Sequence, residues 1–272
     1  MGMTIEEKRK INSRRLFYAI GCLGIVEFAL MALKDVYLDV PGELFIVTMA
    51  IAAIIGIIPI AIFAHRAQKL ETAFWKEVAT QYGYAYVYRP YFQDKALMFQ
   101  EGHGKATGHG LTGTLLDRPF RFFQYRYTTG SGKHRQTHHY CVSEIVFTGS
   151  FPHIYLNNVR NRNLTSIKSF FLPRVALPAP LEGKFNLHGP KGYEIEVLEI
   201  FTPDILAHLL DVDWQHDFEL VDQKLYIFRE GSLSTRQELE DEVKRLQKLL
   251  EILSPKLNRA TLTPIGDLTH AL

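Results

Sequence analysis

The sequence contains only two cysteines, and their positions exclude a disulfide framework. Cys22 lies within a long apolar run, whereas Cys141 lies in a segment with the composition of a strand. A small secreted domain held together by disulfides needs more cysteines than this. The pattern therefore suits a domain that folds in a reducing compartment.

Polar residues are nearly absent from two runs close to the N-terminus. Residues 16–33 contain one charged residue, Glu27, and residues 44–64 contain one polar residue, Thr48. At 1.5 Å per residue, each run is long enough to cross a hydrocarbon core of about 30 Å. Neither run has the amphipathic period of a core helix. We therefore predict a membrane anchor in residues 1–66, with transmembrane helices at about 16–33 and 44–64.

The distribution of Lys and Arg predicts the orientation of this anchor. Five of these residues precede the first run, one lies in the connecting loop, and Arg66 and Lys69 follow the second run. Because basic residues are retained on the cytoplasmic side, we expect both termini to be cytoplasmic. No small-x-small cleavage site follows the first run, so we expect a signal anchor and not a cleaved signal peptide.

Glu27 is the one ionisable residue within the two predicted spans. A charge at this depth costs several kcal/mol, so we expect Glu27 to be protonated or hydrogen-bonded to a neighbouring helix or another copy. A role in a proton or ion pathway is the alternative. It is disfavoured because neither span offers a second ionisable residue to form a relay.

The remaining sequence predicts a mixed α+β domain with a mainly antiparallel sheet over residues 67–257 and a loose tail over 258–272. Apolar residues at four-residue intervals predict that a helix continues through residues 67–82. Aromatic and β-branched runs predict strands at 84–89, 96–100 and 153–157, further strands and turns in the glycine-rich segment 102–113, a hairpin of 118–127 with 137–148, and a second hairpin of 218–221 with 224–228.

Two helices are predicted near the C-terminus. Thr202 followed by Pro203 is typical of a helix start, and the helix continues through residue 210. Ser234 and Gln237 have the spacing of a capping box, and they begin a long amphipathic helix over 234–253. The apolar face of this helix can pack on its own domain, which we favour, or mediate self-association or a protein contact.

Acidic residues are scarce in the middle of the chain. Residues 118–174 contain nine Lys and Arg and one acid, Glu144, whereas residues 181–272 contain ten Lys and Arg and seventeen acids. The two parts can neutralise each other in the fold, or the basic part can face a partner such as anionic lipid. The residues predicted for lipid contact are Arg160, Arg162, Lys168, Phe170, Phe171 and Arg174, although the same segment can close the core of the domain.

No motif predicts a chemical reaction, a metal or a cofactor. The run Gly130-Ser131-Gly132-Lys133 lacks the remaining residues of a phosphate loop and joins two strands. Five histidines lie between His103 and His139, but they have no recognisable zinc-ligand spacing. Cys141 and His139 lack a third orienting group. The basic-aromatic strand 121–127 has no accompanying RNA-binding motif, so we expect no nucleic-acid partner.

Several segments together resemble a family of uncharacterised bacterial two-pass membrane proteins known only as a domain of unknown function. They are the two N-terminal spans, Phe122–Tyr127 with the TGSGK loop, Pro190–Ile195, Thr202-Pro203-Asp204 and Lys224–Phe228. The resemblance covers nearly the whole chain and implies a location in the bacterial inner membrane. It brings no catalytic residue.

Three functions are compatible with the sequence. The first is a membrane-tethered cytoplasmic binding or scaffolding module that contacts anionic lipid. The second is an enzyme that acts on a lipid or peptide at the membrane, which would require a pocket that joins His109, His138 or Cys141 to an acid. The third is a small transporter or channel component, with Glu27 facing the centre of an oligomer. The absence of a catalytic motif favours the first.

Overall fold

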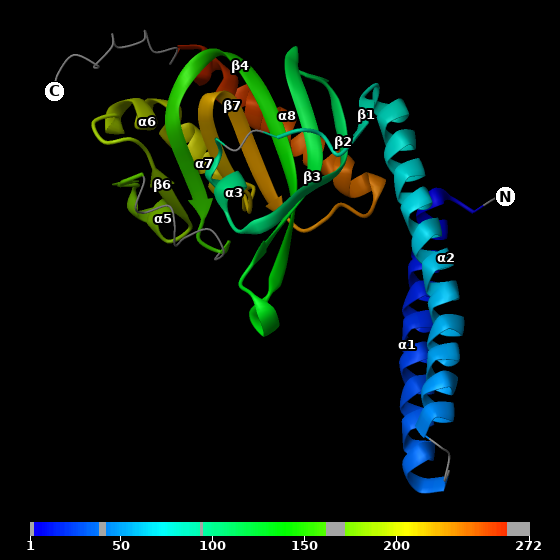
Figure 1. Ribbon diagram of the computed structural model, residues 1–272. Helices are drawn as coiled ribbons and strands as arrows, with labels where there is room; N and C mark the ends of the chain where they lie inside the picture. Colours follow the sequence, from blue (N-terminus) through cyan, green and yellow to red (C-terminus); the bar gives the residue numbers. More distant parts are fainter. Residues whose placement is uncertain (1–2, 38–41, 93–94, 162–171, 260–272) are drawn as a thin grey trace. The chain divides into compact units, whose positions relative to one another are not determined.

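The computed structural model describes residues 3–37, 42–92, 95–161 and 172–259 (Figure 1). The chain divides into two compact units, Met1–Val78 and Ala79–Leu272. The first unit consists of two long helices and is called the helical hairpin below. The second contains the sheet and the remaining helices and is called the sheet domain.

The hairpin consists of α1 (Ile5–Tyr37) and α2 (Gly42–Tyr82), the latter ending in the sheet domain. A capping box starts α1, since Glu7 N–H donates to Thr4 Oγ1 over 3.2 Å and Thr4 N–H donates to Glu7 Oε2 over 2.8 Å. Both helices are longer than their predicted spans. The continuation of α2 through residue 82 confirms the helix predicted beyond the second span.

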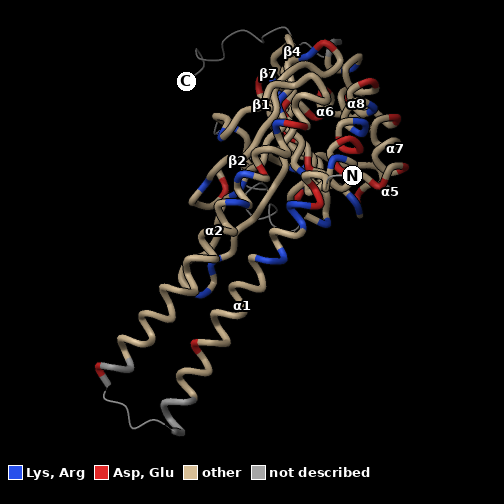
Figure 2. The backbone as a smooth tube through the Cα atoms, turned by 90° about the vertical axis from the view of Figure 1, so that its right-hand side faces the viewer, with Lys and Arg blue, Asp and Glu red and all other residues tan. Residues whose placement is uncertain are grey.

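The apolar parts of both helices are exposed. Helical segments Ile5–Ala32 and Ile46–Tyr82 are long and apolar enough to cross a membrane, and none of the residues in their most apolar windows is buried. Phe17 and Phe28 are each 75% exposed. Figure 2 shows a long stretch of both helices without Lys or Arg. A core helix of a water-soluble protein would bury such a surface, so these helices are suited to lipid.

A narrow seam joins α1 and α2. Leu23, Glu27 and Leu30 are partly buried and share one face of α1, whereas their neighbours are exposed. Gly56 of α2 lies so close to Leu23 that a Cβ atom there would overlap with the leucine side chain. Glu27 thus lies on the helix–helix seam, and no hydrogen bond to its carboxyl group is found among the described residues.

The sheet domain is built on one antiparallel sheet, which confirms the predicted α+β class. The strand order is β1-β2-β3-β4-β6-β5, and β7 pairs with β4 along most of its length. The long strand β4 is therefore the centre of the sheet. Within the described residues the strands are β1 (Ala85–Tyr88), β2 (His103–Leu115), β3 (Arg118–Thr129), β4 (Gln136–Asn158), β5 (Arg174–Val175), β6 (Phe185–His188) and β7 (Asp217–Glu230).

Each face of the sheet is covered by a different element. On one face, Phe99 of the short helix α3 (Leu97–Gln100) packs against Tyr125, Tyr226 and Phe228 at ring-centroid distances of 5.0 to 5.7 Å. The opposite face is covered by α8 (Arg236–Arg259), which lies behind the sheet in Figure 1. The prediction of a strand at 96–100 was wrong. The short helix places three consecutive apolar residues, 97–99, in the core.

Two further predictions about strands were wrong in their connectivity. Residues 153–157 form no separate strand but continue β4, which has register irregularities on both sides of Phe151. Residues 218–221 and 224–228 form one strand, β7, and not a hairpin. Asp222 has a φ of 54°, a conformation that Asp tolerates better than most residues, and the strand bends there without reversing. The hairpin of β3 with β4 was predicted correctly.

The other short helices of the domain are η1 (Gly132–His134), α5 (Ala179–Glu182) and α6 (Glu194–Ile200). Helix α7 (Pro203–Asp211) begins at the predicted Thr202-Pro203 pair. The apolar face of α8 is buried in its own domain, where Leu239, Leu246 and Leu250 are almost fully covered. This face is therefore already occupied, and it would have to detach before it could bind a second copy.

The start and end of α8 differ from the prediction. The capping box lies one residue later, with Thr235 and Glu238 as its members. Ser234 N–H also donates to Glu238 Oε2 over 2.7 Å. Pro255 does not end the helix, which continues to Arg259. The predicted loose tail begins at 258, and residues 260–272 lie outside the described part of the chain.

This capping box gives a first testable prediction. Replacement of Thr235 by alanine removes the oxygen that accepts Glu238 N–H, and it should lower the free energy of unfolding by about 1 kcal/mol. Chemical denaturation of the full-length protein in mild detergent measures this difference. The matched control is Thr235→Ser, because serine keeps the hydroxyl oxygen that accepts Glu238 N–H. Equal destabilisation by both changes would contradict the assignment.

Candidate functional site

The sheet domain contains a polar cleft of about 420 Å³. Its walls come from the end of β4, the segment between α7 and β7, the last residues of β7 and the middle of α8. We call it the arginine cleft. The residues that line it are Arg160, Asn161, Val212, Asp213, Trp214, Gln215, His216, Arg229, Glu230 and Arg245.

The curvature of the sheet brings these distant residues together. His216 immediately precedes β7 and Arg229 is near its other end, yet both line the cleft. Residues near the two ends of β7 can line one cleft only if the strand bends. The bend lies at Asp222, opposite the register irregularity in β4. The arch of β4 is visible in Figure 1.

Three guanidinium groups line the cleft, and they differ in their partners. Arg160 Nη1 donates to both carboxylate oxygens of Asp213, at 3.1 and 3.0 Å. The hydrogen bonds from Arg160 hold the pKa of Asp213 below its usual value. Among the described residues, no acid forms an ion pair with Arg229 or Arg245. The Nη1 atom of Arg229 is buried and has no hydrogen-bond partner within the described part of the chain. The lining contains three arginines and two acids, Asp213 and Glu230, so the cleft retains a net positive charge.

A buried histidine–carboxylate pair forms part of the cleft wall. His216 Nε2 lies 3.0 Å from Glu242 Oε1 and 3.1 Å from Oε2, and the two side chains are only 6% and 3% exposed. The Trp214 ring packs edge-on against the imidazole at 4.9 Å, and Trp214 Nε1 donates to the carbonyl of His216. These contacts fix the orientation of the imidazole. Neither His216 nor Glu242 was among the residues predicted from the sequence.

The buried carboxylate of Asp217 binds several residues at the end of β4, next to the cleft. Asp217 accepts hydrogen bonds from Tyr155 Oη at 2.7 Å, from the Asn158 backbone N–H at 2.8 Å and from Asn161 Nδ2 at 3.0 Å. Asn157 Nδ2 is also within 3.3 Å. Asp217 therefore connects the end of β4 to the start of β7. This network positions Asn161 and Arg160 at the edge of the cleft.

A second cavity of about 320 Å³ adjoins the arginine cleft. It shares Arg160, Asp213 and Trp214 with that cleft and adds the apolar side chains of Phe185 and Leu209. The Arg160–Asp213 ion pair thus lies where the two cavities meet. A ligand with an anionic end and an apolar body would find complementary surfaces on the two sides of this pair.

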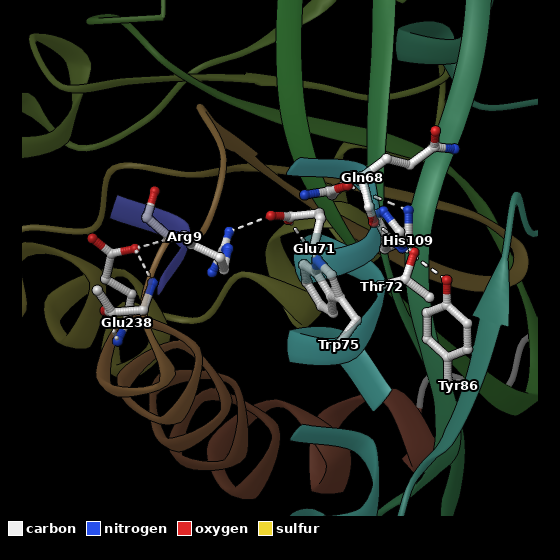
Figure 3. Close-up of polar contacts among 11 residues, drawn as sticks. Arg9, Gln68, Glu71, Thr72, Trp75, Tyr86, His109 and Glu238 are labelled. Atoms are coloured by element: carbon white, nitrogen blue, oxygen red, sulfur yellow. Dashed lines mark hydrogen bonds and ion pairs between the residues drawn. The ribbon is translucent and has the colours of Figure 1, made fainter. Parts of the chain in front are cut away.

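The histidines singled out from the sequence do not meet at one site. His109 Nδ1 is 2.8 Å from the hydroxyl of Tyr86, as Figure 3 shows, and His138 Nε2 is 2.9 Å from Thr129 Oγ1. His103, His134 and His139 are exposed. In the part of the chain that the structure describes, no three His, Cys, Asp or Glu side chains are placed to hold a metal ion.

Cys141 is buried and makes a structural contact. Its thiol donates to the carbonyl of Gly231 over 3.5 Å, and burial raises the pKa of the thiol to about 12. The guanidinium of Arg229, its neighbour across the β4–β7 ladder, offsets only part of this increase. A thiol in this state is protonated at neutral pH and is a poor nucleophile.

Of the residues predicted to contact lipid, the structure describes two. Arg160 pairs with Asp213, which joins the basic middle of the sequence to its acidic end. Lys224 and Glu144 also link the two parts, at 3.1 Å, but here the acid belongs to the basic middle and the base to the acidic end. Arg174 is exposed in β5. Arg162, Lys168, Phe170 and Phe171 lie outside the described residues.

The fold and the cleft define a hairpin of two long apolar helices followed by an α+β domain with a cleft lined by arginines. No protein-family model matches the sequence, and the comparison with curated proteins gives no significant match. Among solved structures, the chain is similar to the crystal structure of the mycobacterial trehalose monomycolate transport factor A, TtfA. The TM-score is 0.45 at 10% sequence identity, and the match covers 66% of this chain and 93% of that chain. A likeness of this degree does not define a ligand or an activity.

Proposed function

We propose that the chain is a membrane-tethered binding module whose sheet domain binds an anionic group, a phosphate or carboxylate, in the arginine cleft. The observation that carries this proposal is that Arg229 and Arg245 both line the cleft, while neither forms an ion pair with an acid in the described residues.

Charge and geometry support an anion as the ligand. Arg229 and Arg245 both line the cleft, and neither is paired with an acid in the described residues. Asp213 is paired with Arg160, and Glu242 is paired with His216, so two carboxylates of this region are already engaged. Guanidinium groups bind phosphate and carboxylate through two parallel hydrogen bonds. The adjoining cavity, whose lining includes the apolar side chains of Phe185 and Leu209, favours an amphiphilic ligand that carries such a group.

The hairpin supports tethering at a membrane. Its exposed apolar surface is suited to lipid, and the excess of Lys and Arg at the ends of the two helices favours cytoplasmic termini. On this proposal the sheet domain is cytoplasmic and binds its ligand close to the inner membrane surface. The sequence resemblance to bacterial two-pass proteins is consistent with this location.

Binding of small anions tests the proposal. Titration of the full-length protein in mild detergent with inorganic phosphate or succinate, at constant ionic strength, should raise its melting temperature. The double variant Arg229→Gln/Arg245→Gln should weaken this binding at least tenfold, because each charged hydrogen bond contributes about 1.5–3 kcal/mol. Isothermal titration calorimetry gives the affinities.

The matched control for this experiment is Arg126→Gln. Arg126 is an exposed arginine of β3 that does not line the cleft, so its replacement should leave the affinity unchanged. If all three proteins respond equally to phosphate and succinate, the anions act on the whole surface. That result would rule out the cleft as the binding site.

The His216–Glu242 pair favours a second candidate, an enzyme that hydrolyses an anionic lipid or peptide. A carboxylate that orients an imidazole is a common arrangement for a general base. Both groups are almost fully buried, which argues for a structural role. Hydrolysis of phospholipid or ester substrates that is lost in His216→Gln, with anion binding retained, would establish the enzyme.

A further inference from the structure

A further cavity, of about 330 Å³, lies within the helical hairpin between α1 and α2. Its rim carries four basic side chains, from Lys8 and Arg15 of α1 and from Arg66 and Lys69 of α2. Ile11 and Leu70 contribute apolar surface between them. We call this cavity the hairpin pocket.

Helical spacing explains why these residues face one another. Lys8, Ile11 and Arg15 are three and four residues apart and therefore share one face of α1. Arg66, Lys69 and Leu70 have the same spacing on α2. Asn12 joins the two helices beside the pocket, because its side-chain amide donates to the carbonyl of Phe63 over 3.0 Å. Asn12 is buried, so this hydrogen bond fixes the spacing of the helices at the pocket.

The pocket lies at the depth of the lipid headgroups. Arg15 immediately precedes the apolar run that begins at Leu16, and Arg66 follows the run that ends at Ala64 by two residues. The headgroup layer extends about 5–8 Å beyond the hydrocarbon, which is about four or five helical residues. Arg15, Arg66 and Lys69 therefore lie within this layer when the apolar runs span the membrane.

The four cations of the pocket have no acidic counterpart there. No acid lines the pocket, and none of the four forms an ion pair with an acid in the described part of the hairpin. A neighbouring residue shows the contrast, because Arg9 is paired with Glu71, which also accepts from Trp75 Nε1 (Figure 3). The hairpin thus neutralises one of its cations and leaves those of the pocket available to a ligand.

We propose that the hairpin pocket binds the phosphate group of an anionic phospholipid. The basic rim matches the charge of that group, and the apolar surface of Ile11 and Leu70 matches the adjoining glycerol and upper acyl chain. Basic pockets between membrane helices on the cytoplasmic side have the character of sites for anionic headgroups. This site is distinct from the arginine cleft and does not depend on the function of that cleft.

Native mass spectrometry of the delipidated full-length protein in mild detergent tests the proposal. Phosphatidylglycerol and phosphatidylcholine with identical acyl chains are the two probes. The wild-type protein should bind phosphatidylglycerol at least tenfold more tightly than phosphatidylcholine. The double variant Arg15→Gln/Arg66→Gln should weaken phosphatidylglycerol binding about tenfold or more, since each basic residue near the headgroups contributes about 1 kcal/mol. Phosphatidylcholine binding should be unchanged.

Lys10 and Arg14 provide a matched control. They are exposed on other parts of the α1 surface and do not line the pocket. Lys10→Gln/Arg14→Gln removes the same charge from the same end of the hairpin and should change the affinity less than twofold. Arg15→Lys/Arg66→Lys retains the charge and should retain most of the binding. Retained binding in this variant shows that replacement of these two positions does not itself unfold the hairpin. Equal losses in both glutamine variants, or equal affinity of the wild type for the two lipids, would overturn the proposal.

Discussion

Replacement of Asp217 by alanine is expected to lower the free energy of unfolding of the sheet domain by about 4 kcal/mol. Asp217 is 1% exposed and accepts hydrogen bonds from Tyr155, Asn157, Asn161 and the backbone of Asn158. Without the carboxylate, buried donors such as the Asn158 backbone N–H lose this acceptor, and each such loss costs about 1–3 kcal/mol. Asn161 still donates to the carbonyl of Gln215, so its contribution is smaller. The effect is large because one residue serves several donors from two segments of the chain.

Thermal unfolding of the full-length protein, followed by near-ultraviolet circular dichroism, measures this effect. A loss of about 4 kcal/mol in a domain of this size lowers the melting temperature by about 10 °C. Asp211→Ala is the control, because Asp211 is an exposed acid on the last turn of α7. Asp211→Ala should change the melting temperature by less than about 2 °C. If Asp217→Ala were equally mild, the network would not stabilise the cleft.

The Cys141 thiol is expected to react at least about a thousandfold more slowly than an ordinary cysteine at pH 8. Burial raises its pKa to about 12 from an ordinary value of 9.0, so the thiolate fraction falls by about three orders of magnitude. Lack of access to the buried sulfur slows the reaction further. The second cysteine, Cys22, is replaced by serine to leave one thiol.

Iodoacetamide labelling at pH 8, followed by intact-protein mass spectrometry, provides the measurement. The control variant carries Cys22→Ser together with Cys141→Ser and Ser131→Cys, which places one thiol in the exposed connection between β3 and β4. That thiol should react at an ordinary rate, whereas Cys141 should react only after denaturation. Rapid labelling of Cys141 in the folded protein would show that the β4–α8 region opens readily.

The raised pKa of the Cys141 thiol also lowers the stability of the folded protein at high pH. The folded state keeps the Cys141 thiol protonated up to a pKa of about 12, whereas the unfolded chain releases the proton near pH 9. The folded state therefore binds more protons between these values, and stability falls as pH rises from about 9 towards 12. Below pH 9 the stabilisation from the neutral thiol is fully present. Cys141→Ala should reduce this alkaline loss.

Patterns that are local in the sequence were sufficient for much of the fold. Two apolar runs predicted α1 and α2, the alternation on both sides of Thr128–Gln136 predicted the β3–β4 hairpin, and the leucine spacing predicted α8. In each case the signal lies within one segment, so no knowledge of the tertiary structure is needed. The pattern left open whether the apolar face of α8 packs on its own domain or on another protein, and the structure shows the former.

The errors arise where tertiary pairing decides the outcome. Asp222-Gln223 has the composition of a turn, but both halves of β7 pair with the same strand, β4, so the chain bends without reversing. Residues 97–99 form a helical turn because Leu97 N–H donates to the buried carboxylate of Glu219, which is distant in sequence. Neither partner can be identified from the local composition.

The arginine cleft could not be predicted for the same reason. Glu242 lies on an amphipathic helix, where a charged residue is expected to face solvent. It is instead buried against His216, which belongs to a different segment of the chain. The polar run Asp213–Asp217, between a helix and a strand, is the one local signal that could have drawn attention to this region. The basic residues of the hairpin were visible in the sequence, but the structure was needed to show that four of them surround one cavity.

The central position of β4 determines the order in which the chain can fold. Its partner β7 lies far along the chain, with Tyr140 opposite Glu230, so this pairing cannot form until residue 230 has been synthesised. Sheets with such distant pairings form slowly and expose unpaired edges until they close. The central strand of the sheet is therefore fully paired only once β7 is in place.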